Sequence, residues 1–431
     1  MTKTSDILIL GATGLTGRQV TKFLAAHVDR TSRNFTLAIA ARSKQKLQAL
    51  VSDLSLSQDI NLVSLDVTNE VAVNGAMQQT RIVINTVGPY SKYGEPVVKA
   101  CAQNGVHYVD LTGETLWIAH IIRNYDYLAT KTHSIIVPSC GFDSIPSDLS
   151  VYIANKALKE VDPSLDIASS TTVFDKIEGI ISAGTLDSAM AMRTLPAHER
   201  NASLRDYLLS PVQGPPSPQA HLLYNIQVPG TSRYIKGSFW FMSGSNRSIV
   251  QRSWGLLEQE LLQKNTSTTT HRYGPSMVYE EFLKARGAIS ASIISTTIAL
   301  VWGLLGFSPF RWLIRKLLAS NVSTASDERL EKGSFRTINI TTSTTSVNHP
   351  NPVKVTTTLI GKGDPGYLLS PIWMAECALA LLDPESLPER ARRGGILTPA
   401  TAFGDVLVKR IEDNGRFIVK REVHDESKKT V

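Results

Sequence analysis

Short apolar runs rich in β-branched residues alternate with helix-like segments through the first 140 residues of the chain. In the segments between the runs, apolar positions recur at spacings of three and four residues. This alternation predicts a doubly wound α/β domain built on a parallel sheet. The expected strands lie at 6–10, 36–41, 60–66, 81–87, 106–111 and 134–139. The expected helices lie at 15–27, 44–54, 69–79, 94–104 and 115–132.

From about residue 148 the pattern changes to longer, more polar strands, such as those within 166–175 and 346–363. Such strands favour an antiparallel or mixed sheet, so we expect a second domain there. Near its end the chain becomes helical again. Thr398, Pro399 and Gly415 are typical of the N-cap, the first turn and the end of a helix.

A glycine-rich turn links the first expected strand to the first expected helix. Gly11, Gly14 and Gly17 follow a GxxGxxG spacing within "ILILGATGLTGRQV". Such a turn leaves the strand tightly, gives a pyrophosphate room beside the backbone and directs the helix N-terminus at the phosphates. A merely structural turn is the alternative. The position at the first strand–helix junction favours a dinucleotide site.

The residues that follow the second strand bear on which nucleotide is bound. They are Ala41, Arg42 and Ser43, and no carboxylate occurs before Asp53. A carboxylate at this position would accept a hydrogen bond from the ribose 2′-hydroxyl of NAD, whereas Arg42 and Ser43 suit the 2′-phosphate of NADP(H). An exposed solubilising arginine is the alternative for Arg42.

Two further loops are expected along the cofactor. Asp66 and Val67, after the third strand, are placed to border the adenine. Gly88 and Pro89, after the fourth strand, lie at the carboxyl edge of the sheet, where open α/β sheets bind ligands.

Several blocks together resemble the saccharopine dehydrogenase-like oxidoreductases. They include "GATGLTGRQV", "VINTVGPYSKYGEPVVKACAQNGVHYVDLTGE", "CGFDSIPSDL" and "GGILTPATAFGDVLVKRIEDNGRF". The similarity is strongest to the branch with trans-acting enoyl reductases and lipid-droplet-associated members. It implies a Rossmann-type NADP-binding domain over 1–147, a C-terminal return at 390–424 and an inserted α/β (α+β) substrate domain over 148–389. The segment 200–280 matches poorly, so the resemblance does not assign the substrate.

The resemblance also implies roles for individual residues. The pyrophosphate would lie against Gly11, Ala12, Thr13, Gly14, Leu15, Thr16 and Gly17, the 2′-phosphate against Arg42, and the nicotinamide against Val87, Gly88, Pro89 and Tyr90.

Hydride transfer to a substrate also requires a source of protons. Tyr90 or Tyr93 is a candidate to donate that proton or to polarise a thioester carbonyl, with packing of the loop as the alternative role. Glu114 and Asp143 are expected at carboxyl ends of strands, where they would orient a substrate or relay a proton. Asp143 also suits an Asx-turn before a helix, and this structural role is the expectation we favour.

Composition restricts the remaining classes of function. The 431 residues are 42% apolar and 19% charged, with a net charge of +7 from dispersed basic residues, so we expect a globular protein and no nucleic-acid partner. Three widely spaced cysteines show no metal-binding spacing, so no metal site is expected. The N-terminus lacks the apolar core of a signal peptide, which favours the cytosol.

One run of twenty residues, 288–307, contains no charge, and basic and aromatic residues border it. A single membrane span would separate the two halves of the cofactor domain. We therefore expect a hydrophobic anchor over 288–319 that enters one leaflet or a lipid monolayer, with burial inside the protein as the alternative. The terminal "KKTV" resembles a retrieval signal of the endoplasmic reticulum.

The leading hypothesis is an NADPH-dependent oxidoreductase that reduces a lipid or acyl-chain substrate of the enoyl type. It would act on the cytosolic face of the endoplasmic reticulum membrane or at a lipid droplet. An imine reductase of the saccharopine type and a non-catalytic lipid-droplet scaffold are the rival hypotheses, and a homodimer is left open.

Overall fold

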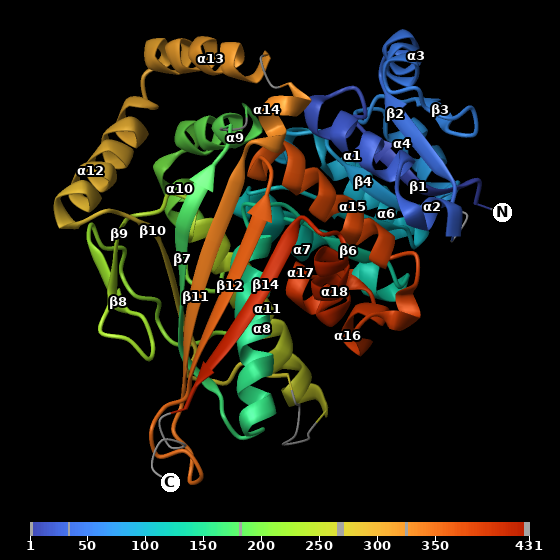
Figure 1. Cartoon of the computed structure of the whole chain (residues 1–431). Helices are drawn as coiled ribbons and strands as arrows, with labels where there is room; N and C mark the ends of the chain where they lie inside the picture. Colours follow the sequence, from blue (N-terminus) through green and yellow to red (C-terminus); the bar gives the residue numbers. More distant parts are fainter. Residues whose placement is uncertain (1–2, 33–34, 181–182, 265–270, 324–325, 426–431) are drawn as a thin grey trace.

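In the described part of the chain, two seven-stranded sheets lie side by side and helices connect them (Figure 1). The computed structural model describes residues 3–32, 35–180, 183–264, 271–323 and 326–425. The terminal lysines 428–429 of the expected retrieval signal fall outside these ranges.

The first sheet is parallel throughout, with the order β13-β6-β5-β4-β1-β2-β3. All six strands expected from the sequence are present, so the Rossmann-type prediction is confirmed. Their bounds are β1 Ser5–Leu10, β2 Leu37–Ala41, β3 Asn61–Ser64, β4 Thr80–Asn85, β5 His107–Asp110 and β6 Ile135–Val137. The seventh strand, β13 (Gly395–Ile396), comes from the C-terminal part of the chain.

Alternate residues of the strands point to opposite faces of this sheet, and both sets are apolar. Both faces therefore need a cover, and helices provide it. In β1, Ile7 and Ile9 belong to one buried cluster and Leu8 and Leu10 to another. Gly105 ends one covering helix with a φ of 64°, a left-handed conformation that favours glycine. The helices that follow the first five strands are α1 Leu15–Ala25, α3 Lys44–Asp53, α4 Glu70–Gln78, α6 Glu95–Asn104 and α7 Thr115–Lys131.

The second sheet is mixed, with the order β14-β12-β11-β7-β10-β9-β8. Among its described pairs, β7 and β10 run parallel and the others antiparallel. Its strands are β7 Ile167–Glu178, β8 Tyr224–Gln227, β9 Tyr234–Ser238, β10 Val278–Lys284, β11 Ser334–Ser343, β12 Lys354–Lys362 and β14 Phe417–His424.

The C-terminal return at 390–424 is divided between the two sheets. Strand β13 joins the parallel sheet, but β14 pairs with β12 at the edge of the second sheet. Conversely, α15 (Ser370–Ala380), which falls within the expected substrate domain, packs against α1 of the cofactor domain. Every residue of α15 is buried, because the helix lies between the two halves of the molecule.

Helix α8 (Ile145–Val161) starts just after β6 and packs against β11 and β12 of the second sheet. It therefore connects the carboxyl edge of the parallel sheet to the second domain. The other helical elements are α2 Val28–Ser32, α5 Tyr90–Tyr93, α9 Ala183–Thr194, α10 Ala197–Ser203, α11 Ser243–Lys264, α14 Asp327–Glu331, η1 Pro365–Leu369, η2 Pro384–Ser386, α16 Glu389–Arg392, α17 Pro399–Phe403 and α18 Asp405–Asp413.

The uncharged run forms most of an arm at the periphery of the molecule (Figure 1), made of α12 (Ala288–Leu304), which contacts β9, and α13 (Ser308–Ser323), which turns back to contact α9. The two helices meet at a bend of 116°, and as a pair they have the length and composition of a broken span. Within the described residues, no single helix is both long and apolar enough to cross a membrane. Along α12 only Ala291 and Ser295 are buried, so this chain does not bury the run in its own core.

Candidate functional site

The glycine turn at the end of β1 has the shape of a phosphate cradle. Gly11 has a φ of 77°, a conformation that favours glycine. A side chain at Gly17 would overlap the Gly11 carbonyl oxygen and lie 2.8 Å from the Ala12 Cα atom. Thr13 and Gly14 are exposed at the start of α1. The turn thus leaves open backbone beside a helix N-terminus, which fits a dinucleotide pyrophosphate.

The loop after β4 lies directly against this turn. The Thr86 hydroxyl donates a hydrogen bond of 2.7 Å to the Leu10 carbonyl oxygen, and the Val87 amide donates one of 3.0 Å to Asn85 Oδ1. A side chain at Gly11 would meet Val87 Cγ2 at 2.9 Å. The structure therefore brings together the two segments that the sequence assigned to the pyrophosphate and the nicotinamide.

At the other end of the site, Arg42 and Ser43 connect β2 to α3. Ser43 is the N-cap of α3, where its hydroxyl accepts a hydrogen bond of 3.3 Å from the Lys46 amide. The side chain of Arg42 is exposed. Nearby, hydrogen bonds from Thr68 lower the pKa of Asp66, and the charge of Arg42 contributes to that lowering. An exposed arginine beside a helix N-terminus is a suitable partner for a 2′-phosphate.

Of the two candidate tyrosines, Tyr90 is buried and its hydroxyl is occupied. That hydroxyl donates a hydrogen bond of 2.9 Å to the Asn85 carbonyl oxygen, and burial raises the pKa of the phenol. These contacts favour the packing role for Tyr90. Tyr93 is half-buried, and Lys92 Nζ lies 5.0 Å from the centre of its ring.

Glu114 holds the same loop in place. Its Oε1 accepts a hydrogen bond of 2.8 Å from the Tyr90 amide, and its Oε2 accepts one of 3.0 Å from the Ser91 amide. Both oxygens face the first turn of α5, so Glu114 orients the nicotinamide-side loop.

Asp110, the last residue of β5, is buried and connects the loops after β5 and β6 through hydrogen bonds. Its Oδ1 accepts hydrogen bonds from the Thr112 amide at 2.9 Å and the Ser139 amide at 3.0 Å, and Oδ2 accepts one from the Tyr108 hydroxyl at 2.8 Å. Burial raises the pKa of its carboxyl to about 6. The sequence did not single out Asp110, although its position at the end of a strand was a usable signal.

The expected Asx-turn at Asp143 is wrong. The amide of Ile145, which would donate to such a turn, instead donates a hydrogen bond of 3.0 Å to the Gly141 carbonyl oxygen. Asp143 is half-buried, and its carboxyl has no hydrogen-bond or ion-pair partner among the residues that the structure describes. Loss of hydration raises the pKa of this carboxyl to about 6.

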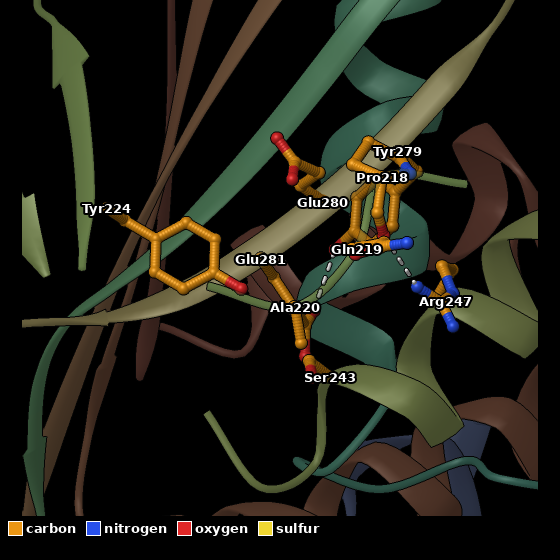
Figure 2. Close-up of a pocket in the computed structure, with 9 residues that line it drawn as sticks. All are labelled: Pro218, Gln219, Ala220, Tyr224, Ser243, Arg247, Tyr279, Glu280 and Glu281. Atoms are coloured by element: carbon orange, nitrogen blue, oxygen red, sulfur yellow. Dashed lines mark hydrogen bonds between the residues drawn. The ribbon is translucent and has the colours of Figure 1, made fainter. Parts of the chain in front are cut away.

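A buried polar cluster joins α8 and α11 to the second sheet. Glu281 of β10 accepts hydrogen bonds from Asn246 at 2.8 Å, Ser147 at 2.7 Å and Tyr279 at 2.8 Å. Burial raises the pKa of Glu281 to about 7. The recess beside it, between β10 and α11, has a volume of about 20 Å³, and Figure 2 shows the residues around it. A volume of this size suits a water molecule and excludes an organic substrate.

A chain of aromatic contacts leads from the loop after β6 to the arm. The Phe142 and Phe174 rings lie 5.9 Å apart, Phe174 and Trp240 5.0 Å, and Trp240 and Phe241 4.6 Å. At the far end the amide of Phe239 donates a hydrogen bond of 2.9 Å to Ser295 Oγ of α12. The sequence did not indicate this path, because residues 239–241 carry no periodic or motif signal.

The chain is similar to known proteins across almost its whole length. Residues 7–173 match the family model described as the saccharopine dehydrogenase NADP binding domain. A Mycobacterium tuberculosis protein, provisionally named a trans-acting enoyl reductase, is 30% identical over 95% of this chain and 96% of its own. The trans-acting enoyl reductase of Mycobacterium ulcerans is 29% identical over 97% of this chain and 98% of its own.

Among solved structures, the apo saccharopine dehydrogenase (L-Glu forming) of Saccharomyces cerevisiae has the same fold. The match covers 97% of this chain and 99% of that chain, with a TM-score of 0.56 and 13% sequence identity. At this identity the likeness concerns the fold alone. It extends to both sheets, since nearly all of both chains is aligned.

Proposed function

The chain belongs to the saccharopine dehydrogenase NADP-binding family, and from this premise we propose that it reduces a lipid or acyl-chain substrate, most concretely an enoyl thioester. It is an NADP-binding oxidoreductase related to the trans-acting enoyl reductases, as expected from its sequence. The family alone leaves the substrate open, because its members share a fold and a cofactor site.

The observation that supports an acyl substrate is the aromatic path from Phe142 to Phe241. Its inner end adjoins the loop after β6 at the carboxyl edge of the parallel sheet, and its outer end reaches an aromatic side chain that is 45% exposed. The inner rings pack against one another in the core, so the exposed Phe241 at the outer end is the part of the path that a ligand can reach. An exposed aromatic surface favours contact with a hydrocarbon chain over contact with an amino-acid adduct, whose carboxylates require cationic partners.

The arm supports a lipid surface as the place of action. Ile289, Ile293 and Leu300 of α12 are 81%, 61% and 61% exposed, and Phe307 and Trp312 are 65% and 63% exposed. Transfer of one such side chain from water to lipid is favourable by about 1.5–3 kcal/mol.

Basic residues strengthen this proposal. Arg286 precedes the arm, and on α13 the Lys316 Nζ atom lies 5.3 Å from the centre of the Trp312 ring. Each basic residue near an anionic surface contributes about 1 kcal/mol to binding. We place the arm in one leaflet or monolayer, on the cytosolic side of the endoplasmic reticulum or at a lipid droplet.

In this reaction the chain holds and orients the reactants. When bound, NADPH supplies the hydride. The glycine turn would hold the pyrophosphate, Arg42 would bind the 2′-phosphate, and residues 87–90, fixed by Glu114, would border the nicotinamide.

The proposal is tested by titrating the purified protein with NADPH and with NADH, followed by turnover assays. We expect micromolar NADPH binding, weaker NADH binding, and NADPH oxidation with trans-2-dodecenoyl-CoA but not with an imine of glutamate. Oxidation with the imine alone would replace the proposal with an imine reductase. Binding without any turnover would favour the scaffold hypothesis, and failure to bind NADPH would contradict the enzymatic function altogether.

A further inference from the structure

The carboxyl groups at the substrate side of the parallel sheet differ in whether their oxygens are already bonded. Glu114 accepts two backbone amides, and Asp110 accepts two amides and a hydroxyl. Asp148, in the first turn of α8, accepts hydrogen bonds from Ser253 and from the Ala400 amide. Among the described residues on the loops after β5 and β6 and the first turn of α8, Asp143 is the carboxylate whose oxygens carry no such bond.

The backbone on both sides of Asp143 is nevertheless fixed. The amide of Phe142 donates a hydrogen bond of 2.9 Å to Ser370 Oγ, and the hydroxyl of Ser144 donates one of 3.3 Å to Asn246 Oδ1. These two anchors come from α15 and α11, on different sides of the loop. A free carboxyl on a fixed backbone is the arrangement that a proton donor needs, because its position does not depend on the ligand.

Asp143 also adjoins the aromatic path. Phe142, its neighbour in sequence, packs against Phe174 at 5.9 Å and against Phe335 at 5.0 Å. The Phe142 ring is buried in the core, so Asp143 lies beside apolar side chains at the carboxyl edge of the sheet, where open α/β sheets bind ligands. The carboxyl of Asp143 keeps contact with solvent, so it can recover a proton after each turnover.

We propose that Asp143 is the catalytic acid that protonates the substrate carbon α to the thioester. The inference rests on the proposed enoyl reduction. The carbon–carbon π bond breaks, the β carbon gains the hydride, and the α carbon gains the proton released from Asp143. The substrate is reduced by two electrons, the nicotinamide is oxidised, and the Asp143 carboxylate then takes a proton from water.

The desolvation of Asp143 supports this role. It raises the pKa of the carboxyl to about 6, which leaves a working fraction of the acid form near neutral pH. Tyr93 is the rival donor, because it ends α5 beside the loop after β4 and, within the described residues, its hydroxyl makes no hydrogen bond.

The first test compares Asp143→Asn with Tyr93→Phe, using NADPH and trans-2-dodecenoyl-CoA. We expect Asp143→Asn to lower kcat about 100-fold, with KM and NADPH affinity nearly unchanged. Wild type and Tyr93→Phe should lose rate as pH rises above 6, and Asp143→Asn should not. Full activity of Asp143→Asn, or loss of the pH dependence in Tyr93→Phe instead, would overturn the proposal.

The second test needs no substrate. A carboxyl whose pKa is raised on folding contributes stability below its unfolded pKa of 3.8, and this contribution is lost as pH rises through about 6. Asp143→Asn should therefore melt several degrees higher than wild type at pH 8 and about equally at pH 4. No gain at pH 8 would mean that the carboxylate has a partner, which contradicts the inference.

The two tests separate the failure of the inference from the failure of the proposed function. An active wild type with an equally active Asp143→Asn variant removes the role of Asp143 and leaves enoyl reduction standing. A wild type that is inactive with the enoyl thioester removes enoyl reduction, and the proton-donor role with it, whatever the melting temperatures show.

Discussion

The carboxyl edge of the parallel sheet and the α12–α13 arm differ in where their side chains find partners. At the edge, Tyr90 and Phe142 are buried, and polar groups such as Glu114 and Asp110 are bonded within the protein. On the arm, large apolar side chains face outward, as Ile289 does with 81% of its surface exposed. Apart from Asp143, these carboxyl groups of the edge are bonded within the protein, whereas the described part of the chain leaves large apolar side chains of the arm exposed.

The difference shows that a segment of the chain can be hydrophobic for two reasons. The strands of the parallel sheet are apolar because they form the core. The arm is also apolar, but its contacts with the body are polar at Ser295, at the Trp302 carbonyl oxygen and at Arg315, while large apolar side chains stay exposed. Contiguous exposed apolar surface of this kind marks an interaction site. Hydropathy alone does not distinguish the two cases, and the location in the fold does.

The largest expected effect is a loss of NADPH binding when the glycine turn at the carboxyl edge is altered at Gly17. We expect Gly17→Ala to abolish detectable NADPH binding, because the added methyl group overlaps backbone atoms of the glycine turn. Fluorescence titration with NADPH measures this. Gly75→Ala is the control: it adds the same methyl group to α4 where nothing lies within 4 Å, and it should stabilise the protein by about 1 kcal/mol. Normal binding by Gly17→Ala would contradict the assigned cradle.

Removing apolar side chains from the arm should weaken lipid binding and leave the cofactor site at the carboxyl edge unchanged. Replacing Ile289, Ile293 and Leu300 together by Ser should cost roughly 5–9 kcal/mol of lipid binding, because three side chains no longer enter the lipid. Flotation with phosphatidylcholine vesicles containing phosphatidylserine measures the loss, and NADPH affinity should not change. The matched control replaces three side chains of similar exposure elsewhere, Val28, Val71 and Leu204. If the control triple loses flotation as well, the arm has no special role.

Glu281 is a buried carboxyl whose hydrogen bonds come from the protein body, unlike the exposed groups of the arm. Its pKa is raised by burial to about 7, so the folded state keeps a proton that the unfolded state releases near 4.5. Its contribution to stability is present below 4.5 and lost as pH rises through 7, a change of about 3 kcal/mol.

Urea unfolding at pH 5 and pH 8 measures this contribution. Glu281→Gln should flatten the pH dependence. Glu178→Gln should not, since ion pairing and hydrogen bonding lower the pKa of Glu178 out of this range. Parallel pH profiles for wild type and Glu281→Gln would argue against the assigned burial effect.

The smallest expected effect concerns the choice of nucleotide. We expect Arg42→Gln to weaken NADPH binding about 10- to 100-fold, because one charge-assisted contact to the 2′-phosphate is lost. NADH binding should be unchanged. Arg123→Gln, an exposed arginine on α7, is the control. An equal loss of NADPH and NADH affinity would show that Arg42 does not contact the 2′-phosphate.

The cofactor half was predictable because its signals are local. Six strands, five helices, the left-handed Gly105 and the Thr398 cap follow from periodicity and turn chemistry within short windows. The glycine spacing locates the phosphate cradle for the same reason, since each residue acts through its own backbone.

The rest depends on contacts between distant segments. Strand β14 joins the second sheet by pairing with β12, and Ser295 meets Phe239 across 56 residues of chain. The error at Asp143 has a related cause. An Asx-turn and a turn closed by the Gly141 carbonyl oxygen have similar sequences, and the choice between them depends on anchors at Ser370 and Asn246.

The most direct test of a lipid-facing enoyl reductase is the rate of NADPH oxidation with trans-2-dodecenoyl-CoA, measured with and without anionic vesicles. We expect turnover by the wild type that rises when vesicles are added. The arm variant at Ile289, Ile293 and Leu300 should retain the vesicle-free rate and show no such rise. No oxidation of NADPH, or an identical response to vesicles in both proteins, would contradict this function.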